Sequence, residues 1–192
     1  CERREMNGQR PQAQNVSGKK VIDWQALERK KIYFGHQSVG NNILAGIQDV
    51  LQENQAARIR MVETSSRIDI VAGTLAHSSI GANESPISKI NDFRVKIDNG
   101  LGNHVDIALF KFCFVDIDSR TDIKAVFEKY RHTMTELKAR YPGTTFVHCT
   151  VPLLRKENTS FKAWMKKLLG RGDSFFDNRH NRARNEYNTL LM

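Results

Sequence analysis

The sequence lacks several features that would fix a function class at once. No apolar run approaches the roughly 18 residues that a membrane-spanning helix needs. Cysteines are few, and the spacing of Cys1, Cys113 and Cys149 is not that of metal ligands, which argues against a zinc site. No basic segment is interleaved with aromatic residues as in a nucleic-acid-binding motif. Accordingly, we expect no metal, no cofactor and no nucleic-acid partner.

What is present is the composition of one globular domain. The chain has 192 residues, of which 40% are hydrophobic and 27% charged, enough to bury a sizeable core. Its formal net charge is +9. Such a charge fits an anionic partner such as a membrane surface or an acidic polymer, but a solvated basic surface is the simpler interpretation.

The first twenty residues have no apolar periodicity and are predicted to be a flexible tether before a domain over residues 21–192. A cysteine followed by such a tether resembles a processed bacterial lipoprotein, in which Cys1 carries the lipid. The other interpretation is a chain that simply starts at a cysteine, and the sequence leaves both open. The first places the protein in the cell envelope or outside the cell, and a cytoplasmic location also stays open.

From residue 21 onward, apolar patterns alternate between strand and helix. Strands are predicted over 31–34, 58–62, 105–115 and 144–154, and helices over 23–29, 39–53, 87–97, 123–141 and from 180 onward. The stretch 65–86 is predicted to be a long loop, and 153–177 a basic irregular insertion. This order suits right-handed parallel crossovers and predicts a flavodoxin-like, three-layer α/β/α domain with a mostly parallel sheet.

Ser38 holds the most informative position. It follows the apolar residues 32–34 and Gly35, and it precedes a helix whose apolar stripe comprises Val39, Ile43, Leu44, Ile47, Val50 and Leu51. Helix N–H groups and the positive end of the helix dipole favour a nucleophile there; the competing interpretation is an N-cap serine. In a parallel sheet Ser38 shares the carboxyl edge with Asp116 and Thr150, which favours a site.

This pattern resembles the SGNH (GDSL-type) hydrolase superfamily, whose nucleophilic serine follows the first strand. Gly35-His36-Gln37-Ser38 stands where the family has Gly-Asp-Ser. The resemblance implies that the N–H groups of Ser38 and Gly81 form the oxyanion hole. Of the family's Gly-x-Asn-Asp motif only Asp116 remains, because Val115 replaces the asparagine. Either Asn83 or another donor takes over that role, or the oxyanion hole is poorer.

The family places a catalytic Asp-x-x-His in a loop after its fifth strand and before its last helix. We expect the domain to be truncated at its C-terminus relative to the complete family fold. His36 and His77 are the candidates for a substitute base, and they join Gln37 and Asp116 in the expected substrate pocket. The resemblance implies a serine esterase acting on an acyl or acetyl ester of a carbohydrate. A non-catalytic glycan- or envelope-binding domain on the same fold is the alternative.

Overall fold

The computed structural model describes residues 23–53, 58–154 and 178–192. The predicted tether, Cys1 and nearly all of the predicted insertion lie outside the described residues. Among the described helices, none combines the length and the hydrophobicity of a membrane span.

The described residues form a sheet of five parallel strands in the order β2-β3-β1-β4-β5. The strands are β1 (Lys31–His36), β2 (Arg60–Glu63), β3 (Thr74–Ser79), β4 (Ile107–Phe110) and β5 (Thr145–Val147). Apart from the edge strand β2, the order from β3 to β5 matches the start of the flavodoxin-like arrangement, in which the first strand lies between the second and the third.

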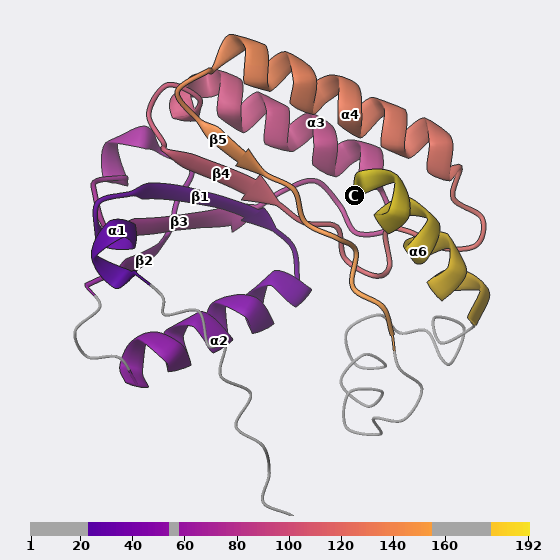
Figure 1. The fold of residues 1–192 in the computed structure, drawn as a ribbon, viewed down its shortest axis with the longest axis horizontal. Coiled ribbons are helices and arrows are strands. Elements are labelled where there is room, and N and C mark those ends of the chain that lie inside the picture. The colour runs from indigo at the N-terminus through magenta and orange to yellow at the C-terminus, as the bar shows by residue number, and fades with distance from the viewer. Residues whose placement is uncertain (1–22, 54–57, 155–177) are drawn as a thin grey trace, which may run out of the picture.

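Helices cover both faces of this sheet, which confirms the predicted three-layer α/β fold (Figure 1). Helices α3 (Pro86–Lys96), α4 (Ile123–Arg140) and α6 (Asn178–Leu191) lie on one side. Helix α2 (Val39–Glu53) lies on the other, and the short α1 (Trp24–Glu28) precedes β1. A 3-10 turn (Arg67–Asp69) and a π-type turn (Ile97–Leu101) complete the described elements.

The two faces are buried to very different extents. Alternation along β1 sends Tyr33 toward α3 and Phe34 toward α2. Tyr33 joins a large core with many aromatic rings, whereas the fully buried cluster under α2 contains only Phe34, Leu44 and Leu75. Among the described residues, the larger hydrophobic core therefore lies on the α3–α4 side of the sheet.

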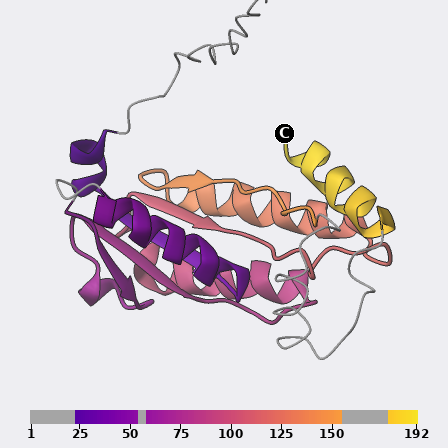
Figure 2. The same ribbon diagram turned by 90° about the horizontal axis from the view of Figure 1, so that it is seen from below.

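Helix α2 keeps part of its apolar stripe in solvent, which differs from the expectation of a buried face. Leu44 is buried, but Ile43 is 42% exposed and Val50 is 39% exposed. Figure 2 looks onto this face and shows α2 crossing it, with α3 and α4 behind the sheet. No long helix lies beside α2 in the described part of the chain.

Three predictions about the strands need correction. Residues 65–86 are not one loop, because β3 lies within them between β1 and β2. The apolar run 105–115 contributes only Ile107–Phe110 to the sheet, and the run 144–154 contributes only Thr145–Val147. Phe112 and Phe114 are buried all the same, since the chain turns over the sheet edge there. Hydrophobicity therefore predicted burial correctly and overestimated strand length.

Candidate active site

The candidate site lies at the carboxyl edge of the sheet, where β1, β3 and β4 all end. Lys111 N–H donates to Gly35 O (3.4 Å) and Ile80 N–H donates to His36 O (2.9 Å), so the three chain segments leave the sheet side by side. The strand order reverses at β1, because β3 and β4 lie on either side of it. Open α/β sheets bind their ligands in the crevice that such a reversal creates.

Ser38 occupies the turn between β1 and α2 and is half-buried. Its carbonyl accepts a hydrogen bond from Asn41 N–H (3.1 Å) at the start of the helix. Its hydroxyl makes no hydrogen bond with any described residue. A serine at a helix start normally caps the helix with its side chain. The Ser38 hydroxyl does not, so it is available to react with a substrate.

Next to this turn, two histidines form a hydrogen-bonded pair. His36 lies at the end of β1 with only 3% of its surface exposed, and its Nε2 lies 3.1 Å from Nδ1 of His77. His77 belongs to β3 rather than to a flexible loop, which corrects the prediction for this residue. One nitrogen of the pair carries the shared hydrogen, and the tautomers decide which.

The surroundings of both imidazoles favour the neutral form. Burial lowers the pKa of His36, and His77 and Lys111 act in the same direction. Burial also lowers the pKa of His77, while Glu63, its partner in the register of β2, opposes the shift. Neutral imidazoles can accept a proton, so this pair has the chemistry of a general base.

Gly40 makes room for the pair. It lies in the first turn of α2, and a Cβ placed on it would overlap the Cβ of His36 and lie 2.5 Å from the ring atoms Cγ and Nδ1. The absence of a side chain at Gly40 thus allows the helix to approach the imidazole directly.

Gln37 connects the turn before α2 to the loop after β3. Its amide nitrogen donates to the carbonyls of Ile80 (3.1 Å) and Gly81 (2.7 Å). The structure therefore brings Gln37 and Gly81 together, as expected for one site, but the Gln37 amide is used to hold the loop.

Gly81 has the backbone that a glycine requires, with φ of +48°, and a Cβ would lie 2.5 Å from the nitrogen of Lys89. Its N–H donates to Asp92 Oδ2 at 2.8 Å. An oxyanion bound at this N–H, as the family resemblance implies, would have to displace the Asp92 carboxylate.

Asp116 and Asn83 belong to a buried network around Lys89, whose side chain is completely inaccessible. Lys89 Nζ donates to Asp116 Oδ2 (2.6 Å) and to Asn83 Oδ1 (3.1 Å). Asp116 also accepts from the N–H groups of Cys113 (2.6 Å) and Glu84 (3.0 Å). Burial raises the pKa of Asp116, and Lys89 opposes that shift. These contacts give Asp116 an anchoring role between α3 and the loop after β4.

The amide nitrogen of Asn83, by contrast, has no hydrogen-bond partner among the described residues. Asn83 is half-buried at the same sheet edge, so it retains an N–H donor for a ligand. Of the two oxyanion donors expected after β3, Asn83 is the one whose hydrogen atoms are available.

Sequence reasoning missed two buried lysines at this edge. Lys89 lies four residues before Phe93, on the same face of α3, and this spacing was the available signal. Lys111 is 4% exposed. Among the described residues its Nζ has only long contacts, to Phe112 O (3.4 Å) and Cys113 Sγ (3.7 Å). Burial lowers the pKa of Lys111, and the charge of Lys89 adds to the effect. The signal for Lys111 was a charged residue inside the apolar run 105–115.

Cys113 and Cys149 are both free thiols. Within the described ranges, no group of three His, Cys, Asp or Glu side chains is arranged to hold a metal ion.

A scan against protein-family models finds no match for this chain, and a search of curated proteins finds no relative.

Proposed function

We propose that the chain is a serine esterase of the SGNH type, with Ser38 as its nucleophile. The observation that carries the proposal is the unengaged Ser38 hydroxyl at the turn between β1 and α2, two residues after His36, whose imidazole contacts His77. A nucleophilic serine needs an adjacent base and an exposed position at the sheet edge, and this turn is suited to both.

In the proposed reaction, Ser38 Oγ attacks the ester carbonyl carbon while its proton passes to an imidazole of the pair. The alcohol leaves with that proton, and water then hydrolyses the acyl-serine by the same route. The Asn83 amide and the backbone N–H of Ser38 are the donors assigned to the oxyanion. Loss of one such donor typically costs about 2.7–4 kcal/mol in the transition state.

The substrate class proposed from the family resemblance is an acyl or acetyl ester of a carbohydrate. An envelope location through a lipid on Cys1 belongs to the same proposal, and mass spectrometry of the native N-terminus tests it. A lipid-sized mass on Cys1 supports the envelope assignment, and an unmodified cysteine contradicts it.

Hydrolysis of p-nitrophenyl acetate by the full chain tests the esterase. Ser38→Ala should abolish the activity, whereas Ser79→Ala, at the end of the neighbouring strand, should retain it. Activity should fall at acidic pH as the imidazoles become protonated. Activity that survives Ser38→Ala would contradict the assignment of the nucleophile.

A non-catalytic binding domain is the second candidate, and one observation favours it. The Gly81 N–H is already bonded to Asp92, and Val115 has no side-chain donor. If the folded protein hydrolyses no ester but binds an acidic glycan in a titration, the binding domain replaces the esterase.

A further inference from the structure

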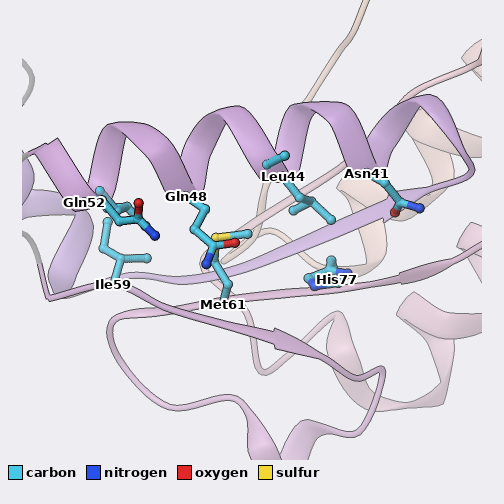
Figure 3. Close-up of a pocket in the computed structure, with 9 residues that line it drawn as sticks. Asn41, Leu44, Gln48, Gln52, Ile59, Met61 and His77 are labelled. Atoms are coloured by element: carbon cyan, nitrogen blue, oxygen red, sulfur yellow. The ribbon is translucent and has the colours of Figure 1, made fainter.

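A groove of about 600 Å³ lies between α2 and the outer strands of the sheet. Figure 3 shows side chains from α2 facing Ile59, Met61 and His77 across it. The volume is within the range of small-molecule sites. Because β2 is an edge strand, the groove opens at the side of the domain.

The lining of the groove is uncharged, although the chain carries a net charge of +9. Five lining side chains are aliphatic or a thioether, and three are carboxamides on α2; the lining comprises Leu44, Ala45, Leu51, Ile59, Met61, Asn41, Gln48, Gln52 and His77. Apart from the His77 imidazole, no ring among the described residues lines the groove, so those residues offer no stacking platform for a sugar or a base. Its charge and composition complement a neutral, flexible aliphatic chain.

One end of the groove adjoins the candidate active site. His77 lines that end and contacts His36. Asn41 also lines it, and the Asn41 N–H donates to the carbonyl of Ser38 (3.1 Å). The other end reaches Gln52, so the groove follows α2 for eleven residues, about 16 Å at 1.5 Å per residue.

We propose that this groove binds the aliphatic acyl chain of the substrate, with the ester carbonyl at the His77 end. This inference rests on the proposed esterase and specifies its substrate as an ester of a medium-length acyl group. The aliphatic side chains contact the chain, and the carboxamides of Gln48 and Gln52 stay in water along the rim.

Chain-length dependence provides the kinetic test. Each methylene removed from water is worth up to about 0.8 kcal/mol, which corresponds to roughly a fourfold gain. Along the p-nitrophenyl esters of acetate, butyrate and octanoate, kcat/KM should therefore rise with each added methylene by up to roughly fourfold. A constant or falling kcat/KM along this series would overturn the proposal.

A binding experiment separates the groove from the catalysis. In the full chain with isotope-labelled methionine methyl groups, 1-octanol should shift the methyl resonance of Met61, which lines the groove. Met134 lies in the core on the opposite face of the sheet and should not shift. Absence of a Met61 shift at octanol concentrations below those that unfold the protein would refute the groove as a binding site.

Two neighbouring residues supply a matched pair of variants. Ala45→Phe places a ring in the groove and should remove both the octanol response and the preference for octanoate over acetate. Gly46→Phe is the control, because a Cβ at Gly46 meets no atom within 4 Å. Loss of the response in both variants, or in neither, would contradict the assignment. Octanol binding in a protein without Ser38-dependent hydrolysis would support the groove and refute the esterase.

Discussion

Gly40 and Gly46 lie six residues apart in α2 and differ in what a side chain would meet. A Cβ at Gly46 finds open space, whereas a Cβ at Gly40 overlaps the Cβ of His36. Rotation of the imidazole cannot relieve this overlap, because the position of a Cβ is fixed by the backbone of β1. Gly40→Ala therefore has to push α2 away from the strand.

The two alanine variants should change stability in opposite directions. Replacing a helix-interior glycine by alanine gains about 0.5–1 kcal/mol, so Gly46→Ala should be stabilised by that amount. Overpacking costs about 1–3 kcal/mol. After the helix-propensity gain is subtracted from this cost, Gly40→Ala should lower the free energy of unfolding by up to about 2 kcal/mol. Because both variants replace glycine by alanine in the same helix, the propensity gain cancels in the difference between their free energies of unfolding. The difference that remains measures the steric overlap at Gly40.

Urea titration measures this difference as a free energy of unfolding, and thermal unfolding measures it as a difference in Tm. For a domain of this size 1 kcal/mol moves Tm by about 2–4 °C, so a 2 kcal/mol difference should separate the variants by about 4–8 °C. Gly40→Ala should also lower esterase activity, because the His36–His77 contact is disturbed, and Gly46→Ala should not. Equal stability of the two variants would refute the close approach of α2 to His36.

Further predictions concern buried charge and pH. Lys89→Met leaves Asp116 buried without its cation and should cost about 3–5 kcal/mol in urea unfolding; Lys96→Met, which breaks a partly exposed pair with Asp92, should cost less than about 1 kcal/mol. Arg184→Met removes the hydrogen bonds that Nε donates to the carbonyls of Phe114 and Ile117 and should cost about 1–3 kcal/mol. Because the pKa values of His36 and His77 are lowered in the folded chain, the unfolded chain binds protons at a higher pH than the folded chain does. The free energy of unfolding should therefore fall as pH drops below the ordinary histidine pKa of 6.5. A His36→Asn/His77→Asn variant should show a smaller fall than the wild type, and an equal or steeper fall would contradict the buried neutral pair.

The sequence predicted the elements with strong periodicity. Helices α2 and α4 have long amphipathic stripes, and the structure has them within one residue of the predicted bounds. Strand β3 was missed because Thr74–Ser79 combines small and polar residues with a single leucine. Hydrogen bonds to β1 on one side and β2 on the other make it a strand. The local composition does not show which strands will pair with it.

The candidate site was predictable to a similar degree. The turn that holds Ser38 followed from strand-to-helix order, because parallel strands end at a common edge. The contact between His36 and His77 did not, since it depends on the register between β1 and β3. The hydrogen bond from Gly81 N–H to the Asp92 carboxylate could not be predicted either, because it depends on how α3 packs beside the loop after β3.

Covalent labelling with a fluorophosphonate, followed by peptide mapping, tests the central claim most directly. The probe reacts with an activated serine and needs no knowledge of the natural substrate. The account predicts modification of Ser38 in the wild-type chain, slower modification in His36→Asn, and none in Ser38→Ala. A folded wild-type chain that stays unlabelled, or that is labelled at Ser79 instead, would contradict the assignment of Ser38 as the nucleophile.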